Sequence, residues 1–306
     1  MTSISPPFQS VTVIGLGLIG SSIARSVREA MPGVRLNGFD VSADVCDRAA
    51  SLQLVDLLAE GSEAAVSGAD LVILCVPVGA MAEAAISIAP HLRPGTIVTD
   101  VGSAKGLIAR EIRAALPDAV VIPAHPIAGT ENSGPEAGFA GLFRNRWCIL
   151  TPEDSTDPAD IARLVSFWDA LGARVEIMDA ARHDLVLAIT SHLPHLIAFT
   201  IVGTASHLEA VTEGEVIKYS AGGFRDFTRI AASNPVMWRD VFLANQEAVL
   251  DVLGRFLADL GSLENAIREA DGPALFDWFS RTGAIRRAII YEGQDVAAPD
   301  FGRQKQ

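Results

Sequence analysis

The chain has 306 residues, 49% of them hydrophobic and 20% charged, so it has enough apolar residues for a large core and is long enough for about two domains. Its formal net charge of −13 argues against nucleic acid as a partner, because phosphates would be repelled, whereas a local arginine still allows a small anionic substrate. The cysteines, Cys46, Cys75 and Cys148, are far apart in the sequence, which predicts structural thiols in a reduced, cytoplasmic protein and no metal site, and Cys75 lies within an apolar run that predicts burial.

No targeting or membrane-spanning segment is predicted. The first ten residues lack the basic and apolar pattern of a signal peptide. The most apolar long stretch, residues 185–202, is interrupted by Ser191, His192, Pro194 and His195. We therefore expect a buried helix that carries polar functional or packing residues, and no membrane partner.

A glycine motif follows the first predicted strand, residues 11–14. It reads Gly15-Leu16-Gly17-Leu18-Ile19-Gly20 and precedes a predicted helix at 21–27, so it has the form G-x-G-x-x-G in a strand–helix context. The first glycine permits a tight turn, the second lets the backbone approach a pyrophosphate, and the third lets the helix pack close to the strand. The predicted cofactor-binding residues here are Gly15, Gly17, Leu18, Ile19 and Gly20.

The second predicted strand, residues 34–40, ends in an acidic residue. Asp40 lies 20 positions beyond Gly20, where a carboxylate accepts hydrogen bonds from the ribose hydroxyls of the adenosine and repels a 2′-phosphate. No arginine follows at 41–43 to hold such a phosphate. The pattern favours NAD over NADP, and its alternative is an aspartate that only caps a helix or turn.

Two further strands complete the predicted cofactor platform. Residues 71–77 are apolar throughout, as expected for a parallel strand covered on both faces, and Val76 and Pro77 are expected to line the cofactor crevice. Residues 96–100 form the next strand. In the loop after it, Ser103 is expected to bond a neighbour or the nicotinamide end, and Lys105 is expected to be a solvent-exposed cation.

The fold class follows from the alternation of strands and helices over residues 9–178, which predicts an α/β, doubly wound, mostly parallel sheet (Rossmann). No clear strand remains after residue 179. We therefore predict a dinucleotide-binding domain at 1–178 and an all-helical substrate and dimerisation domain at 179–306. The apolar-periodic segments of the second domain are 180–208, 235–259, 261–270 and 273–291.

The seven residues His125-Pro126-Ile127-Ala128-Gly129-Thr130-Glu131 are the predicted chemical centre. They follow a predicted strand at 120–122 and combine an imidazole, a hydroxyl and a carboxylate with a proline and a glycine, which predicts a shaped loop. A histidine just past a strand end of an α/β sheet lies where ligands bind. The alternative is a surface histidine without a role.

The helical half carries two more polar motifs. In Ser191-His192-Leu193-Pro194-His195 the histidines share a helical face, and Pro194 is expected to bend the helix so that one histidine packs while the other faces a cleft. A zinc site is not predicted, because no acidic partner is placed beside them. Further on, Arg225, Asp226 and Arg229 are spaced like one helical turn, so an arginine here either binds a carboxylate or belongs to a solvated charge cluster.

These motifs resemble those of the prephenate/arogenate (cyclohexadienyl) dehydrogenases of tyrosine biosynthesis, over nearly the whole chain. The resemblance implies oxidative decarboxylation of prephenate and/or arogenate, with hydride transfer to NAD(P)⁺ and loss of the ring carboxylate as CO₂. The segments that carry it are Gly15-Leu16-Gly17-Leu18-Ile19-Gly20-Ser21, Asp100-Val101-Gly102-Ser103-Ala104-Lys105, the seven residues from His125, Ser191-His192-Leu193-Pro194-His195, Asp226-Phe227-Thr228-Arg229 and Met237-Trp238-Arg239-Asp240.

The resemblance also implies roles for single residues. His125 would accept the proton of the 4-hydroxyl as hydride leaves, and Ser103 would support it. His195 would contact the substrate, Arg229 would bind a carboxylate, and Glu131 with its neighbour Thr130 would lie at the mouth of the site. The family is usually dimeric through the helical domain, so a homodimer is expected, in a minimal form without a chorismate mutase or regulatory domain.

Two other functions stay open at this point. A β-hydroxyacid-type dehydrogenase would need a catalytic lysine in the helical half, where only Lys218 precedes Lys305 of the tail and lacks the usual Lys-x-x-x-Asn pattern. A non-catalytic NAD-sensing protein is the third reading. The residues do not distinguish prephenate from arogenate as substrate.

Overall fold

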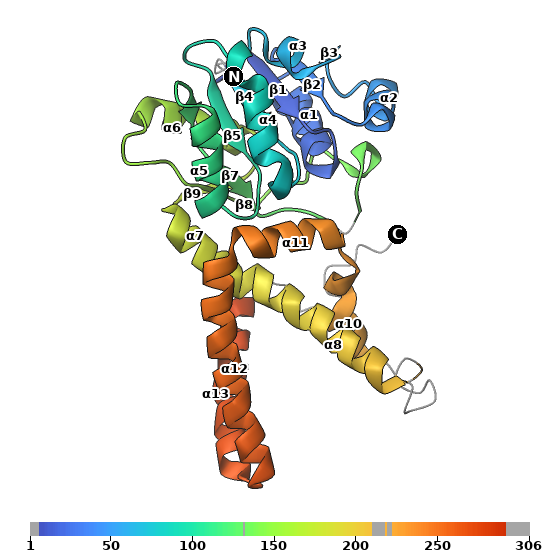
Figure 1. The fold of residues 1–306 in the computed structure, drawn as a ribbon, viewed down its shortest axis with the longest axis vertical. Coiled ribbons are helices and arrows are strands. Elements are labelled where there is room, and N and C mark those ends of the chain that lie inside the picture. Colours follow the sequence, from blue (N-terminus) through green and yellow to red (C-terminus); the bar gives the residue numbers. More distant parts are fainter. Residues whose placement is uncertain (1–5, 131, 210–217, 219–221, 292–306) are drawn as a thin grey trace. The chain divides into compact units, whose positions relative to one another are not determined.

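The computed structural model describes residues 6–130, 132–209, 218 and 222–291 (Figure 1). It forms two compact units, Met1–Leu250 and Asp251–Gln306, which are described separately. The domain boundary predicted at residue 178 falls inside the first unit, where the sheet part of the chain passes into helices, and it stays a prediction.

The first unit is built on a six-stranded parallel sheet with the strand order β3-β2-β1-β4-β5-β6. The predicted doubly wound fold is thereby confirmed. The strands are β1 (Ser10–Ile14), β2 (Arg35–Phe39), β3 (Leu57–Leu58), β4 (Leu71–Leu74), β5 (Ile97–Asp100) and β6 (Val120–Val121). The helices between them are α1 (Leu18–Ala30), α2 (Ala43–Ser51), α3 (Ser62–Val66), η1 (Val78–Ala80), α4 (Met81–Ile88), η2 (Ala89–His91) and α5 (Gly106–Ala115).

Strand β4 shows why an unbroken apolar run forms a central strand. All four of its residues are fully buried. Leu71 and Ile73 belong to an apolar cluster that includes α1, whereas Val72 and Leu74 belong to a second cluster that includes α4 and α5. Successive side chains of a strand point to opposite faces, so a strand covered by helices on both faces must be apolar at every position.

A second, smaller sheet contains β7 (Ala124–Pro126), β8 (Trp147–Leu150) and β9 (Arg174–Ile177). Strand β7 runs antiparallel to β8, with His125 opposite Ile149, and β8 runs parallel to β9. The prediction that His125 lies on a loop is therefore wrong. Its strand is only three residues long and pairs with a partner more than twenty positions away, so no local period announced it. The connection between β7 and β8 contains η3 (Pro135–Ala137), and the connection between β8 and β9 contains α6 (Pro158–Ala170).

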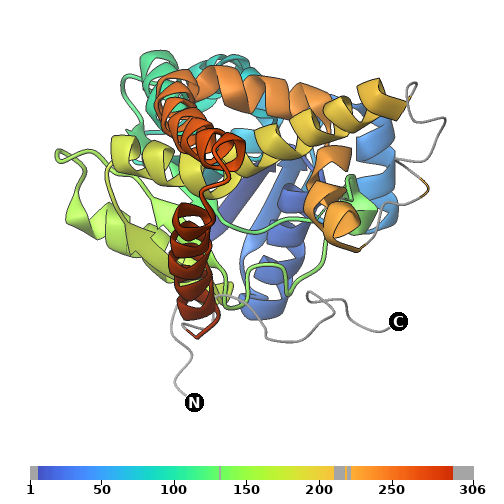
Figure 2. The same ribbon diagram turned by 90° about the horizontal axis from the view of Figure 1, so that it is seen from below.

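The remaining described residues of the first unit are mainly helical. They include α7 (Ala180–Leu187), a π-helical turn at Ala188–His192, α8 (Leu193–Glu209), α10 (Gly222–Thr228), η5 (Arg229–Ala232) and α11 (Pro235–Ala244). Helix α11 packs against η1 and α5, and α10 and η5 pack against α8. Figure 2 shows the yellow α7–α8 segment passing beneath the blue strands of the sheet.

The π turn sits where the sequence predicts a bend. Pro194 has no N–H to give to the carbonyl of residue 190, and its ring crowds that carbonyl, so the helix widens by one residue before it continues. By length and composition alone, the helix at residues 180–207 would suffice to cross a membrane, because an 18-residue window within it has a mean hydropathy of 1.8. Only 22% of that window is buried, so the prediction of a buried helix is wrong for the single chain. The polar side chains His183 and Asp184 of the same segment are buried and bond to the sheet part of the chain.

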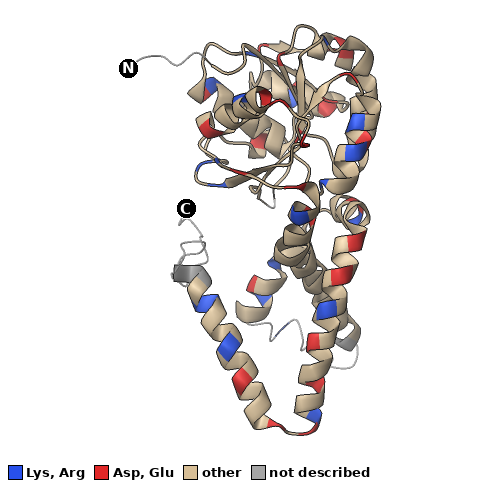
Figure 3. Ribbon diagram, turned by 90° about the vertical axis from the view of Figure 1, so that its left-hand side faces the viewer, with Lys and Arg blue, Asp and Glu red and all other residues tan. Residues whose placement is uncertain are grey.

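The second unit consists of the main part of α12 (Gln246–Arg268) and of α13 (Gly272–Tyr291). Helix α12 is continuous through Gly261, whereas the sequence pattern predicted a break near residue 260. Both helices carry arginines and acidic residues (Figure 3), and two ion pairs on α12 join residues four apart, Asp251–Arg255 and Glu264–Arg268. Large apolar side chains are also exposed here: Leu257, Leu260, Ile267, Phe276, Phe279 and Ile285.

Candidate active site

The glycine motif forms the turn between β1 and α1. Gly15 has φ +95°, and a Cβ there would lie 2.6 Å from the carbonyl oxygen of Cys75, so only glycine fits. A Cβ on Gly20 would lie 1.9 Å from the carbonyl oxygen of Gly15, which is the close helix–strand approach expected of the third glycine. Around Gly17 a Cβ would meet nothing within 4 Å.

The start of α1 is suited to bind an anion. Gly17 caps this helix without a side-chain hydrogen bond, so the first backbone amides, beginning at Leu18 and Ile19, keep their donors. The open space at Gly17 lies beside those donors. Together they fit the pyrophosphate of a dinucleotide, because a helix N-terminus supplies both N–H groups and a positive dipole end.

Asp40 lies beside this turn, at the end of β2. Its carboxylate accepts the backbone N–H of Leu16 at 2.8 Å and that of Ser42 at 2.9 Å. These bonds fix the half-buried carboxylate next to the glycine turn, where the predicted contact with ribose hydroxyls requires it. Val76 and Pro77 come shortly after β4, the strand that pairs with β1. The backbone nitrogen of Val76 lies next to Gly15.

His125 is buried, with 9% of its surface exposed, and its ring is held by a second histidine. Nδ1 of His125 lies 2.9 Å from Nε2 of His183, and Nδ1 of His183 lies 2.8 Å from Oδ1 of Asp184. Nε2 of His125 makes no hydrogen bond to the described residues and is not among the buried unpaired atoms. Burial lowers the pKa of His125 well below 6.5, and nearby His183 and Lys105 lower it further, so the ring is neutral at neutral pH.

Asp184 joins this chain of side chains to helix α5. Its two carboxylate oxygens accept the backbone N–H groups of Lys105 and Gly106, at 2.8 and 2.7 Å, where α5 begins. Burial alone would raise the pKa of Asp184, but these hydrogen bonds and that of His183 lower it below its ordinary value. Asp184 is therefore charged, and its negative charge lies at the positive end of a helix dipole.

Lys105 is fully buried, so the prediction that it is a solvent-exposed cation is wrong. Its Nζ pairs with the equally buried carboxylate of Asp100 and donates to the carbonyl of Ala124 at 2.8 Å. The contact with Ala124 ties the end of β5 to β7, directly before His125. A lysine enters such surroundings only with a charged partner and hydrogen-bond acceptors.

Replacing Lys105 by methionine is expected to lower the free energy of unfolding by about 3–5 kcal/mol, because the Asp100 carboxylate would stay buried without its cation. Urea unfolding followed by circular dichroism measures this. A matched control is Arg255→Met, which removes an exposed pair with Asp251, and we expect a change within about 1 kcal/mol. Equal losses in the two variants would contradict the structural role of the buried pair.

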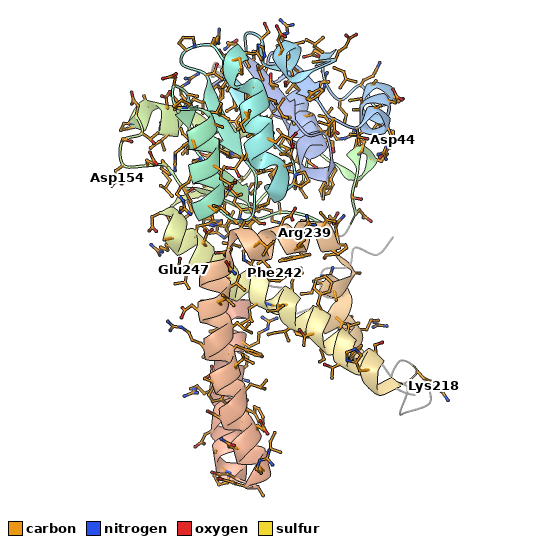
Figure 4. All side chains as sticks on the ribbon, viewed as in Figure 1. Asp44, Asp154, Lys218, Arg239, Phe242 and Glu247 are labelled. Carbon is orange, nitrogen blue, oxygen red and sulfur yellow. The ribbon has the colours of Figure 1, made fainter. Side chains whose placement is uncertain are left out.

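In the helical part, His195 is stacked on Trp238 of α11, with ring centroids 3.7 Å apart. Its Nδ1 donates to the carbonyl of Ser191 at 2.8 Å, so the proton is on Nδ1 and Nε2 is an acceptor. Arg229 lies close enough that its positive charge contributes, after burial, to lowering the pKa of His195. Phe242, one turn along α11 from Trp238 (Figure 4), extends the aromatic cluster, with ring centroids 5.5 Å apart.

Of the two neighbouring histidines one packs, as predicted, and the other is half-exposed; that it faces a cleft stays a prediction. His192 is fully buried, and its Nδ1 lies 3.1 Å from the amide nitrogen of Asn245. Burial lowers the pKa of His192 to about 4, and the backbone of Ser103 lies close enough to oppose this. Ser103 is therefore next to His192, and its predicted support of His125 stays a prediction.

The remaining predicted site residues are Thr130, Glu131 and Arg229. Thr130 is exposed just after β7, with its hydroxyl accepting the backbone N–H of Asn132, and Glu131 lies outside the described residues. Arg229 is exposed at the start of η5, after the ion pair Arg225–Asp226, so the predicted helical turn of charges is confirmed.

Sequence reasoning missed the residues that hold His125: His183, Asp184 and Asn245. The one available signal was the His–Asp pair at the start of the first predicted helix of the second domain. A His–Asp dipeptide alone does not predict a site, because its chemical role depends on a third group that contacts it.

Comparison with known proteins decides which family this arrangement belongs to. Residues 23–177 match the profile described as "Prephenate dehydrogenase, nucleotide-binding domain", and residues 179–281 match "Prephenate dehydrogenase, dimerization domain". The chain belongs to the prephenate/arogenate (cyclohexadienyl) dehydrogenase family. This result replaces the reading as a β-hydroxyacid-type dehydrogenase.

Relatives of this dehydrogenase family match nearly the whole chain. A cyclohexadienyl dehydrogenase of Zymomonas mobilis is 44% identical over 92% of this chain and 96% of its own length. The prephenate dehydrogenase of Aquifex aeolicus, solved with hydroxyphenyl propionate and NAD⁺, is 34% identical with a TM-score of 0.87 and covers 94% of this chain and 100% of its own. The arogenate dehydrogenase of Synechocystis is 30% identical with a TM-score of 0.79, covering 91% and 99%.

Proposed function

We propose that this protein catalyses the oxidative decarboxylation of prephenate and/or arogenate to 4-hydroxyphenylpyruvate and/or tyrosine, with NAD as hydride acceptor. The observation that carries the proposal is the match of both family domains across residues 23–281, on a chain whose buried neutral histidine presents an unbonded nitrogen. The free thiols Cys46, Cys75 and Cys148 suit a reducing cytoplasm, where we place the enzyme.

The sheet part of the chain, residues 1–178 in our proposal, binds the cofactor. NAD, when bound, is the group that accepts the hydride. The open backbone at Gly17 and the amides that open α1 receive the pyrophosphate, and Asp40 accepts hydrogen bonds from the adenosine ribose. Asp40 would also repel the 2′-phosphate of NADP, because its carboxylate is fixed in place by Leu16 and Ser42.

His125 is proposed as the proton acceptor for the 4-hydroxyl of the substrate. A neutral imidazole is required for this role, and burial keeps His125 neutral. The proton moves from the hydroxyl oxygen to Nε2 as the ring carbon loses hydride, and loss of the ring carboxylate as CO₂ then completes the aromatic ring. Ser103, in the loop after β5, is proposed to support His125 from the cofactor side.

The helical part is proposed to hold the substrate. Arg229 would bind a substrate carboxylate through charge-assisted hydrogen bonds, and His195 would offer the acceptor nitrogen Nε2, since its Nδ1 is used by Ser191. Thr130 and Glu131 are proposed to lie at the mouth of the site. This assignment does not choose between the pyruvyl group of prephenate and the aminoacyl group of arogenate.

The decisive experiment is steady-state reduction of NAD and NADP, followed at the absorbance of the reduced cofactor, with prephenate and arogenate offered separately. We expect turnover with at least one substrate and a higher kcat/KM for NAD than for NADP. Absence of cofactor reduction with both substrates would leave a non-catalytic NAD-binding protein. A preference for NADP would remove the proposed role of Asp40.

We also propose that the helical part, residues 179–306, forms a homodimer. Its second family domain bears the name of a dimerisation domain, and α12 and α13 expose large apolar side chains that a monomer would leave in water. An obligate interface of this kind is richer in apolar side chains than the remaining surface.

Replacing Phe276 and Phe279 together by aspartate is expected to convert the dimer into monomers at micromolar concentration, because two charges would enter an apolar interface. Light scattering coupled to size-exclusion chromatography measures the mass. Ala274→Asp on the opposite face of the same helix is the control, since it adds a charge away from Phe276 and Phe279. A dimer of unchanged stability in the Phe276/Phe279 variant would exclude this face.

A further inference from the structure

Burial lowers the pKa of both His125 and His183, and with both rings neutral the side chains His125, His183 and Asp184 can be hydrogen-bonded in only one pattern. A carboxylate only accepts, so Nδ1 of His183 must donate to Asp184. Neutral His183 then carries a lone pair on Nε2, and this atom faces Nδ1 of His125 at 2.9 Å. His125 must therefore donate from Nδ1, which leaves the lone pair of its ring on Nε2.

We propose that His183 and Asp184 are positioning residues that select this tautomer of His125 and so create the base at Nε2. The inference rests on the proposed function, in which Nε2 accepts the hydroxyl proton. Neither residue touches the substrate in this proposal, since both act through His125.

Asp184 is well suited to define the direction of the chain. Its carboxylate receives three donors, Nδ1 of His183 and the backbone amides of Lys105 and Gly106, so it cannot rotate without losing buried hydrogen bonds. The side-chain amide of Asn245 donates to the backbone carbonyl of Asp184 at 2.8 Å and fixes this turn of α7. The carboxylate is thus an immobile acceptor at the N-terminus of α5.

The opposite tautomer is penalised by the same contacts. A proton on Nε2 of His125 would leave two lone pairs facing each other at the 2.9 Å contact between His125 and His183. Reversing His183 as well would aim a lone pair at the Asp184 carboxylate. His183 is fully buried, so water cannot replace either lost hydrogen bond.

The chain also supports the protonated state of His125. When Nε2 takes the hydroxyl proton, the oxygen–hydrogen bond breaks, a nitrogen–hydrogen bond forms, and His125 becomes an imidazolium that keeps its Nδ1–H on His183. Asp184 is linked to His125 through two hydrogen bonds, and its negative charge attracts the new positive charge. It counteracts the buried cation of Lys105, which lies on the same side.

Nitrogen-15 NMR of the protein labelled in its six histidines reads the tautomer directly, without substrate. We expect His125, assigned by its loss in His125→Asn, to be protonated on Nδ1 and unprotonated on Nε2 in the unmodified protein. In His183→Leu, which removes the acceptor, we expect a mixture of tautomers. A wild-type His125 protonated on Nε2 would overturn the proposal, even if the enzyme is active.

Kinetics of His183 variants test the consequence. We expect kcat to fall about a hundredfold in His183→Leu with KM changed less than about threefold, and clearly less in His183→Gln, whose Oε1 can still accept from Nδ1 of His125. His207→Leu, at an exposed histidine near the end of α8, should leave both constants unchanged. Equal kcat values for His183→Leu and the unmodified enzyme would overturn the proposal, whereas an unmodified enzyme without turnover would contradict the proposed function instead.

Discussion

Replacing His125 by asparagine is expected to lower kcat by about a hundredfold to ten-thousandfold, the usual contribution of a general base, while NAD still binds. Asparagine fits the site because its amide can donate to His183 in place of Nδ1, but no atom remains at the position of Nε2. The backbone pairing of β7 with β8 does not depend on this side chain. Stopped-flow or steady-state turnover and fluorescence titration with NADH measure the two effects.

The pH dependence of the unmodified enzyme gives a second readout of His125. The base must be neutral, so kcat/KM is expected to fall as the pH drops through the pKa of His125. That pKa lies well below 6.5, because burial and the neighbours His183, Lys105 and His192 all disfavour the charged ring. The acid limb should therefore lie below pH 6.5 and disappear in His125→Asn. Unchanged turnover of this variant would remove His125 from the reaction.

Replacing Arg229 by alanine is expected to reduce kcat/KM by about a hundredfold or more, corresponding to a lost charge-assisted contact of about 3 kcal/mol. The guanidinium lies near His195, which stacks on Trp238, so a carboxylate bound by Arg229 would lie beside an aromatic wall. Lysine at this position should recover only part of the loss, because it cannot form the two parallel hydrogen bonds of a guanidinium.

The matched control for this prediction is Arg225→Ala, one helical turn earlier. Arg225 is two-thirds exposed and pairs with Asp226 at 3.6 Å, so its removal is expected to change kcat/KM by less than about threefold. Steady-state kinetics with saturating NAD compares the two variants. Near-normal values for Arg229→Ala would place the carboxylate-binding group elsewhere.

The cofactor half of the site was predictable because its signals are local. Gly15, Gly17 and Gly20 form one short motif, and Asp40 follows the next strand, so the pattern can be recognised in the sequence even though the carbonyl that excludes a side chain at Gly15 belongs to the distant Cys75. The apolar run of β4 likewise reports burial on both faces without knowledge of its neighbours.

The environment of His125 was not predictable in the same way. His125 lies opposite residue 149 in its sheet, and its ring bonds to residue 183. The nearby Lys105 is neutralised by Asp100, which the sequence shows only as the last residue of a strand. The expectation of an exposed Lys105 was wrong for this reason: a lysine reads as a surface residue until a buried partner is known.

The sequence by itself determined the fold class and the dinucleotide turn and singled out His125 as the candidate catalytic residue, because each depends on periodicity or on a short motif. Only the tertiary structure decided how His125 is held and which nitrogen is left for chemistry. The hydrogen bonds that settle this span 58 and 79 residues of sequence, and a tautomer is a property of the whole hydrogen-bonded chain. No single segment contains that information, because it arises only when β7, α5 and α7 meet.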